Sequence, residues 1–367
     1  MPEDREKLAQ SYFRSRYSVY FLSLAASAAF VVFFQFSGLS LKGSEWVSGL
    51  TSSRAFQIAG FLAVFHGLHY AVLFPAHFFG SYLLEKKYGL SAEPLSRWAA
   101  DELKAGGMGF VLLVFLVEAF YLAVLPLGRH WWAAASLGWA FTALVLARVL
   151  PGWIVPLFYP MKPLDDGPLR DRLTRLAAEV GVPARGIYEI SLSRKTKKAN
   201  AAVIGIGKSR RIVLGDTLIR NFTPEEIEVV LGHELAHYKE RHVRKMLAFR
   251  FAATTLGFWL LGRYYGVLAR FFGVPAIADV ASYPFLALCA GVFEFLLLPL
   301  QNGLSRRFET AADVFAVRVT RSREAFVSAM RKLASQNLAP LSPHPLIEWI
   351  FFSHPAMERR LRAAEAA

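Results

Sequence analysis

Met108-Gly-Phe-Val-Leu-Leu-Val-Phe-Leu-Val-Glu-Ala-Phe-Tyr-Leu-Ala-Val-Leu-Pro-Leu127 is a run of 20 residues that contains a single charged side chain, Glu118. A helix of about 20 apolar residues matches the thickness of a bilayer's hydrocarbon core, so this stretch predicts a membrane-spanning helix. Of the 367 residues, 54% are hydrophobic and 19% are charged, whereas soluble domains carry about a quarter charged residues. The chain is therefore expected to be a polytopic α-helical membrane protein.

Six stretches of comparable length predict about six transmembrane helices, at roughly 17–38, 55–82, 107–128, 131–160, 247–272 and 280–303. The fifth has the least defined limits because it contains Arg250, Arg263 and Arg270. The connections between spans alternate between rich and poor in Lys and Arg, and cytoplasmic loops carry the excess of these residues. This alternation predicts that both termini and the region 161–246 face the cytoplasm, which in a prokaryote means the inner side of the plasma membrane.

The formal net charge of +14 agrees with this topology, because many basic residues lie in the segments expected on the cytoplasmic side. The chain lacks the aromatic–basic pattern of RNA-recognition modules and the spacing of zinc fingers, so we expect no nucleic-acid partner. The single cysteine, Cys289, excludes an intrachain disulfide and a zinc site built from a cysteine cluster. The lipid bilayer is the first partner that the sequence predicts.

Two soluble portions are expected beside the membrane helices, the first being a mixed α/β region. Its predicted elements are a helix around Leu169–Val180 and β-rich runs at Ile187–Leu192, Asn200–Ile206 and Arg211–Leu214. A turn that includes Lys208 and Ser209 would join the last two runs into a hairpin. The second portion is predicted to be helical to Gln336, Pro-rich through Pro345, and helical again. The expected organisation is a four-helix membrane bundle, a cytoplasmic catalytic domain, two further membrane helices and a C-terminal helical part, at 1–160, 161–246, 247–303 and 304–367.

Thr223-Pro224-Glu225-Glu226 predicts a helix start, with an N-cap threonine, a proline at the first position and a glutamate three residues after the cap. The helix contains His233-Glu234-Leu235-Ala236-His237. Residues i and i+4 share a helix face, so both imidazoles can bind one metal ion while Glu234 reaches its water. In this zincin arrangement Zn²⁺ activates water and polarises a carbonyl, and the glutamate takes the proton. The alternative for the pattern alone is a pair of exposed histidines.

A third protein ligand is expected, because catalytic zinc usually has three and keeps one position open. His242 is rejected because it lies five residues after His237 and lacks the glycine of the metzincin pattern. The better candidate is Glu309, with Asp313 one helical turn later as the acceptor for a ligand histidine. Spacing alone equally allows an ordinary solvated acidic pair beside Arg306 and Arg307.

The order of motifs resembles the integral-membrane zinc proteases of the zinc-dependent CAAX prenyl protease family, to which the heat-shock membrane protease HtpX is related. The resemblance covers nearly the whole chain. Besides the histidine motif and Glu309-x-x-x-Asp313, it rests on four blocks: Glu85-Lys-Lys-Tyr-Gly-Leu-Ser91, Lys198-Ala-Asn200-Ala201, Arg211-Ile-Val-Leu-Gly-Asp216-Thr-Leu, and Ser353-His354-Pro355 with Arg360.

The resemblance implies a gluzincin-like α/β metalloprotease domain that holds one Zn²⁺ per chain. His233, His237 and Glu309 would bind zinc, with Asp313 orienting a ligand histidine and Glu234 as general base. Asn200 and Ala201, on an edge strand, would pair with the backbone of an extended substrate. His354 and Arg360 would lie near the scissile carbonyl and stabilise the developing oxyanion.

The implied function is a zinc endopeptidase that cleaves membrane-associated or lipidated, CAAX-like peptides or proteins. One alternative is an HtpX-like protease that removes misfolded membrane proteins, although the HtpX type lacks this long N-terminal half. A non-catalytic, metal-binding membrane scaffold or transporter is a further alternative, but it would have no use for Glu234. The chain departs from the eukaryotic prenyl protease, which has seven spans where six are counted here.

Ionisable side chains inside predicted spans usually face an interior or an aqueous cavity, because exposing them to lipid is costly. These residues are His66, His69, His77, Glu118, Arg148 and Glu294. We expect them to line a water-filled chamber, and the alternative is hydrogen bonding between helices. The i, i+3 spacing of His66 and His69 also allows a second metal site.

Overall fold

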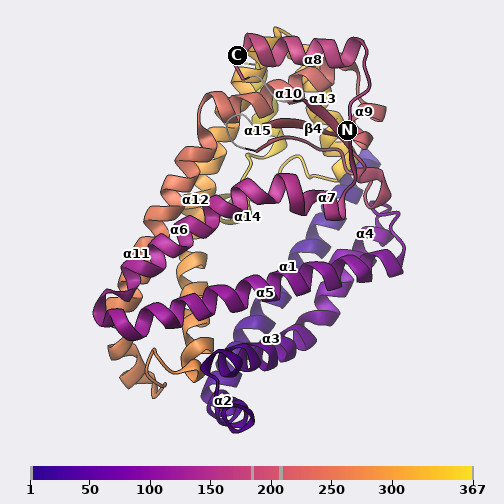
Figure 1. Ribbon diagram of the computed structural model, residues 1–367. Coiled ribbons are helices and arrows are strands. Elements are labelled where there is room, and N and C mark those ends of the chain that lie inside the picture. Colours follow the sequence, from indigo (N-terminus) through magenta and orange to yellow (C-terminus); the bar gives the residue numbers. More distant parts are fainter. Residues whose placement is uncertain (1–2, 183–185, 206–209, 366–367) are drawn as a thin grey trace.

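Long helices dominate the computed structural model, which describes residues 3–182, 186–205 and 210–365 (Figure 1). Within these ranges, five helical segments are long and apolar enough to cross a membrane. They are Glu3–Phe36 (α1), Arg54–Lys87 (α3 at Arg54–Phe78, a π-helical turn and α4 at Leu84–Lys87), Leu95–Val124 (in α5, Leu95–Leu127), Gly128–Val149 (with α6, Trp131–Val149) and Val280–Thr320 (with α12, Tyr283–Thr320). These segments contain or overlap five of the six predicted spans.

The remaining predicted span, 247–272, lies in α11, which begins at His242 and ends at Phe272. It packs along α6 and α12. Arg250 donates to Glu294 Oε2 of α12 at 2.7 Å and to Gln301 Oε1 at 2.8 Å. Arg250, one of the three arginines that weakened this segment as a predicted span, therefore contacts a neighbouring helix, where its charge is paired.

One helix and one boundary differ from expectation. The helix α2 at Leu39–Leu50 was not predicted; its 12 residues are too few for a span. The predicted division at 303/304 does not coincide with a helix end, because α12 runs from Tyr283 to Thr320 without interruption. The sixth span and the helix that carries Glu309 are therefore one element.

A four-stranded sheet lies at the end of the molecule where both described chain ends also lie (Figure 1). Its strands are β1 (Met161–Pro163), β2 (Ile187–Ile190), β3 (Ala201–Ile204) and β4 (Arg211–Gly215), in the order β1-β2-β4-β3. β3 pairs antiparallel with β4, which confirms the predicted pairing. Lys208 and Ser209 of the predicted turn lie outside the described residues. β3 is an edge strand, so one side of its backbone can take another chain.

Helices α8 (Pro168–Glu179), α10 (Pro224–Lys239) and α13 (Arg323–Asn337) enclose one apolar core with this sheet. The side chains of Leu173, Ile212 and Leu235 are fully buried there, and each contributes about 1.5–3 kcal/mol by burial. Gly232 lets α10 and α12 approach closely, since a Cβ at this position would lie 3.3 Å from Val319 Cγ1. Three short helices complete the domain: α9 (Asp216–Asn221), α14 (Pro345–Phe351) and α15 (Met357–Glu365).

Candidate metal centre

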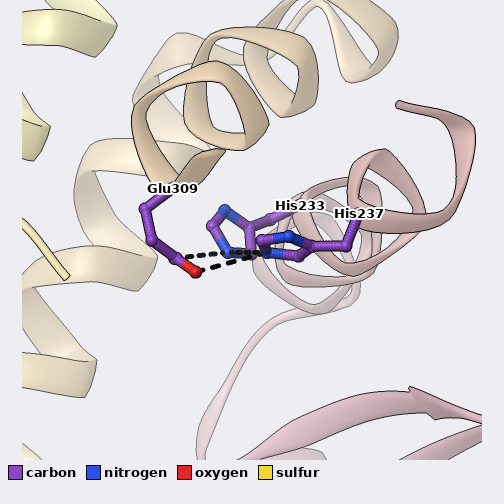
Figure 2. Close-up of side chains that lie close together, drawn as sticks. All are labelled: His233, His237 and Glu309. Carbon is purple, nitrogen blue, oxygen red and sulfur yellow. Dashed lines mark hydrogen bonds and ion pairs between the residues drawn. The ribbon is translucent and has the colours of Figure 1, made fainter. Parts of the chain in front are cut away.

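The helix α10 presents two histidines from a start that the sequence defines locally. Thr223 Oγ1 accepts from the Glu226 N–H at 3.3 Å and Glu226 Oε2 accepts from the Thr223 N–H at 2.8 Å. This capping box satisfies two backbone donors of the first turn and fixes where the helix begins. Two turns later, His233 and His237 share a face, with their Nε2 atoms 3.2 Å apart (Figure 2).

Glu309 approaches the two imidazoles from α12. Its Oε2 lies 3.2 Å from His233 Nε2, and its Oε1 lies 3.5 Å from His237 Nε2 (Figure 2). Tetrahedral zinc with bonds of about 2.0–2.1 Å places its ligand atoms about 3.4 Å apart. The three separations match that value. In the described part of the chain, these residues form the one group of three or more metal-ligand side chains within ligand distance of one another.

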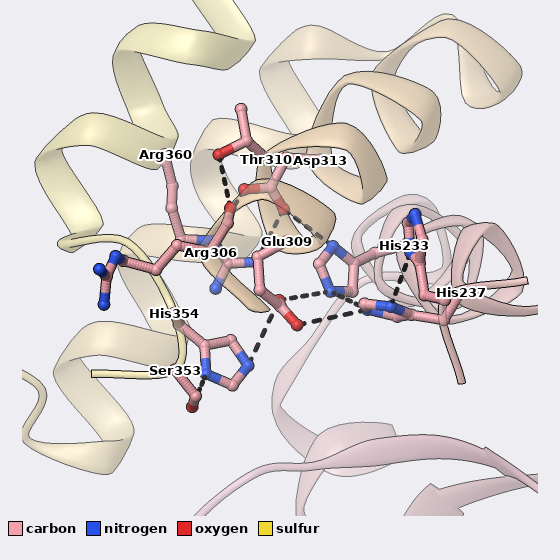
Figure 3. Close-up of polar contacts among 10 residues, drawn as sticks. His233, His237, Arg306, Glu309, Thr310, Asp313, Ser353, His354 and Arg360 are labelled. Carbon is pink, nitrogen blue, oxygen red and sulfur yellow. Dashed lines mark hydrogen bonds and ion pairs between the residues drawn. The ribbon is translucent and has the colours of Figure 1, made fainter. Parts of the chain in front are cut away.

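Asp313 supports His233 from behind (Figure 3). His233 Nδ1 lies 2.8 Å from Asp313 Oδ1, so the carboxylate accepts the Nδ1 proton and leaves Nε2 with a lone pair facing the metal position. Arg360 donates to both oxygens of Asp313, from Nε at 2.8 Å and from Nη2 at 2.7 Å. Such a bidentate pair fixes the carboxylate's orientation.

His242 contacts the other candidate ligand, His237. This contact was not predicted from the sequence. His242 Nδ1 lies 3.2 Å from His237 Nδ1, and the His242 ring stacks on Phe308 with 4.4 Å between centroids. The contact exists because Arg241, with φ of 57°, turns the chain sharply between α10 and α11. The rejection of His242 as a metal ligand agrees with the observed three-residue group. Its supporting position depends on a backbone turn that no glycine or proline signals.

The two histidines and Glu234 have shifted pKa values with different causes. Burial lowers the pKa of His233, but its hydrogen bond to Asp313 and its contact with the Glu309 carboxylate outweigh burial and raise the pKa to about 9. Burial and the neighbouring imidazole lower the pKa of His237 to about 4. Burial raises the pKa of Glu234 to about 7, as suits a carboxylate that must both accept and release a proton near neutrality.

The ligand set fits zinc. Two imidazole nitrogens and one carboxylate are the donors that a catalytic zinc site uses, with a fourth position left for water or substrate. Glu309 Oε2 is buried and has no hydrogen-bond partner among the described residues, although imidazoles surround it. A buried carboxylate oxygen without a hydrogen bond is costly, and a metal ion would satisfy it.

The other predicted site residues meet in one cavity of about 860 Å³. Its lining includes Asn200, Ala201, Glu234, His354 and Arg360. His354 Nε2 lies 3.3 Å from Glu309 Oε2, and Ser353 Oγ holds its Nδ1 at 2.9 Å (Figure 3). Arg360 lines this cavity and also holds Asp313 through its bidentate contact, so it supports His233; its role near the scissile carbonyl stays a prediction.

The register of β3 determines which backbone groups face the cavity. The Gly215 N–H donates to the Asn200 carbonyl at 2.9 Å, so the backbone of Asn200 faces β4. Successive residues of an antiparallel strand alternate between the two edges. The backbone of Ala201 therefore points to the free edge, where Asn200 Oδ1 accepts its N–H at 2.9 Å.

Membrane helices joined to a His-His-Glu centre with a neighbouring glutamate define an integral-membrane zinc metallopeptidase. The model of peptidase family M48 matches residues 163–367, and that of the CAAX prenyl protease N-terminal region, described as having five membrane helices, matches residues 1–160. The chain belongs to peptidase family M48.

Relatives span bacteria and eukaryotes. The chain is 31% identical to the uncharacterized metalloprotease YhfN of Bacillus subtilis, over 90% of this chain and 78% of that one. It is 28% identical to CAAX prenyl protease 1 of Saccharomyces cerevisiae, over 83% and 71%. The crystal structure of S. mikatae Ste24p superposes with a TM-score of 0.90 at 22% identity and covers 100% of this chain and 90% of that one, so the fold is shared. The match over 1–160 covers the half that the HtpX type lacks.

The histidines inside the spans form hydrogen bonds between helices. His66 Nε2 lies 2.9 Å from the Tyr283 hydroxyl, and His69 Nε2 lies 2.9 Å from Ser27 Oγ. His77 pairs with Glu102 at 2.9 Å. All three contacts match the alternative stated for these histidines, hydrogen bonding between helices. His66 and His69 are not part of a three-residue metal group in the ranges that the structure describes.

Proposed function

We propose that this protein is an endopeptidase that cleaves lipidated, CAAX-type peptides near their C-terminus, at the cytoplasmic surface of the membrane. The observation that carries the proposal is that His233 and Glu234 line the same cavity as residues of the membrane helix α1. A substrate anchored in the bilayer could reach the site without leaving the membrane surface. The relatives named CAAX prenyl protease support this substrate class.

Zinc held by His233, His237 and Glu309 would supply Lewis-acid activation of water and of the scissile carbonyl. Glu234 accepts the proton of the attacking water and passes it to the amine nitrogen as that group leaves. His354 donates an N–H to the carbonyl oxygen while negative charge develops there. Ala201 pairs with the substrate backbone at the free edge of β3 and holds the peptide extended.

An aromatic wall suits the lipid of such a substrate. It joins α1 to the segment before His354, with ring centroids 5.6 Å apart for Tyr20 and Phe351 and 6.2 Å apart for Tyr17 and Phe352. All four residues line the cavity. Aromatic rings offer a large apolar surface to an isoprenoid or acyl chain.

Cleavage by the purified protein and by its Glu234→Gln variant tests the proposal. The two should bind zinc equally, at one ion per chain, while the variant loses at least about 100-fold in kcat because it lacks the base. Equal cleavage by both proteins, or wild-type protein without zinc, would contradict the protease function. Matched peptides with and without an S-farnesyl group test the substrate class, since preference for the unmodified peptide favours the quality-control alternative.

We further propose that both termini and the catalytic domain face the cytoplasm, from the alternation of basic and non-basic connections. In a Cys289→Ser background, cysteines introduced at the exposed positions Asp165 and Ala276 test this arrangement. A membrane-impermeant maleimide applied to intact cells should label position 276 and not position 165. The reverse pattern would invert the topology.

A further inference from the structure

The active-site cavity extends from the metal centre to a cation on α1. Four residues with formal charges line it: Arg16, Lys198, Glu234 and Arg360. Lys198 Nζ lies 2.9 Å from Glu85 Oε2, and Arg360 is paired with Asp313. Among the described residues, no carboxylate forms an ion pair with Arg16 within 4.0 Å. The cavity therefore contains a cation that could pair with an anion from outside the chain.

Arg16 lies beside the start of the substrate-binding strand. Tyr12 and Arg16 are one turn apart on the same face of α1, and the Arg16 guanidinium is close to the Tyr12 hydroxyl. Lys198, two residues before Asn200, donates to that hydroxyl at 3.0 Å. This chain of contacts places Arg16 near the N-terminal end of β3, beyond Asn200.

Asn337 closes the free edge of the strand at the same end. Asn337 Oδ1 accepts the Ala199 N–H at 2.9 Å, and Asn337 Nδ2 donates to the Ala199 carbonyl at 3.2 Å. Ala199 faces the same edge as Ala201, because strand residues two apart share an edge. At Ala201 the N–H donates to Asn200 Oδ1 and the carbonyl faces the free edge, where a substrate backbone can pair. At Ala199 the side chain of Asn337 occupies both backbone groups. The peptide must leave the sheet there, on the side where Arg16 lies.

We propose that Arg16 binds the C-terminal carboxylate of the substrate, and that Asn337 ends the paired segment so that the carboxylate turns toward it. The substrate would then run antiparallel to β3 and end a few residues after the cleaved bond. The inference rests on the proposed function and adds the feature by which a peptide end is recognised. A guanidinium suits this task because its paired N–H groups match the two carboxylate oxygens.

The competing role for Arg16 is a general one, in which a basic side chain near the membrane surface attracts lipid headgroups. Arg14 provides the matched control. It is exposed on the same helix, two residues away, and does not line the cavity. Loss of charge at Arg14 tests the surface role, and loss at Arg16 tests both roles.

The experiment compares two S-farnesylated CAAX peptides that are identical except for a free or an amidated C-terminus. Wild-type protein in one detergent should cleave the acid about 10–100-fold faster in kcat/KM, the range for a hydrogen bond between charged groups. Arg16→Gln should lower the rate for the acid to the rate for the amide and leave the amide rate nearly unchanged. Arg16→Lys should restore part of the preference, and Arg14→Gln should keep all of it. Zinc content and melting temperature should be equal throughout.

Three results would overturn the inference while the protease function stands. They are equal cleavage of acid and amide by wild type, an undiminished preference in Arg16→Gln, and a loss in Arg14→Gln as large as that in Arg16→Gln. Wild-type protein that binds zinc and cleaves neither peptide would instead contradict the proposed function, and the inference with it. Asn337→Ala tests the second part of the inference, that Asn337 ends the paired segment of the substrate. It should reduce the preference for the acid, whereas an unchanged preference would show that Asn337 does not direct the peptide end.

Discussion

The two helices that carry the proposed metal ligands are built in opposite ways. α10 has 16 residues, of which nine are buried, and it starts at a capping box. α12 has 38 residues, also with nine buried, and five of these nine lie between Glu309 and Val317. Between Leu286 and Glu309 several apolar side chains are exposed, with 67% of Leu296 and 64% of Leu300 accessible. α10 therefore packs mainly within the catalytic domain, whereas α12 packs in that domain at one end and against α1 and α11 along the rest.

The difference shows that the candidate metal centre lies between two parts of the molecule, the core of the catalytic domain and the long helix α12. The histidines depend on a local start signal and on an apolar core. Glu309 depends on a helix whose other end is expected to lie in lipid. Substitutions in the two helices should therefore act separately on metal binding and on domain stability.

The largest effect is expected at α12. Glu309→Ala removes the carboxylate ligand, so the purified protein should contain almost no zinc and show no measurable cleavage. Glu294→Ala on the same helix removes a carboxylate that pairs with Arg250, far from the centre, and should retain its zinc. Metal analysis of both variants decides the assignment, which fails if Glu309→Ala keeps a full equivalent of zinc.

A smaller loss is expected where α12 supports α10. Asp313→Ala should weaken zinc binding by about 10–100-fold, because His233 loses the partner that orients it. Arg360→Met should weaken it less, since Arg360 acts through Asp313. Competition with a chelator measures both affinities. If Asp313→Ala released all zinc while Glu309→Ala retained it, the roles of the two carboxylates would be reversed.

The cap of α10 should affect stability and leave the metal affinity unchanged. Burial raises the pKa of Glu226, but its hydrogen bonds with Lys332, Ser328 and Thr223 outweigh burial and hold the pKa below its ordinary value of 4.5. Glu226→Gln should therefore lower the free energy of unfolding by about 1–3 kcal/mol at pH 7.

The pH dependence of this difference has a definite sign. A lowered folded-state pKa stabilises the protein above the ordinary value, and the stabilisation is lost as pH falls through the folded-state pKa. The gap in melting temperature between wild type and Glu226→Gln should be constant from pH 8 to about 5.5 and shrink below about 4.5. A gap that widens on acidification would exclude this explanation.

The smallest effect is expected at the other half of the cap. Thr223→Ala removes one acceptor for the Glu226 N–H and should cost about 1 kcal/mol. Thr223→Ser keeps a hydroxyl at the same position and should cost much less. Melting curves of the two variants in the same detergent compare them directly, and equal losses would show that the hydroxyl does not cap the helix.

Sequence reasoning predicted the elements whose signals are local. The run 107–128, the start at Thr223 and the His233–His237 pair all depend on composition or spacing within a few turns, and the structure has helices at each. α2 was missed because 12 residues of mixed character resemble a connection. For Glu309, spacing left a solvated acidic pair as an equal alternative, and the resemblance to a family favoured the ligand.

The features that sequence could not supply depend on tertiary contacts. Asn337 meets Ala199 across 138 residues, and an asparagine near a helix end has no pattern that announces such a partner. His242 reaches His237 only because Arg241 adopts a left-handed conformation. The contact of Arg360 with Asp313 was not predicted, because nothing near Arg360 in the sequence identifies a partner 47 residues earlier.

The continuity of α12 also constrains how the protein is made. His237 is synthesised 72 residues before Glu309, and α11 and the apolar part of α12 lie between them. A nascent or truncated chain that stops before Glu309 holds two of the three zinc ligands, and the last ligand arrives only once both intervening helices have been made. The complete set of proposed ligands therefore exists only after the apolar part of α12, from Tyr283 onward, has been synthesised.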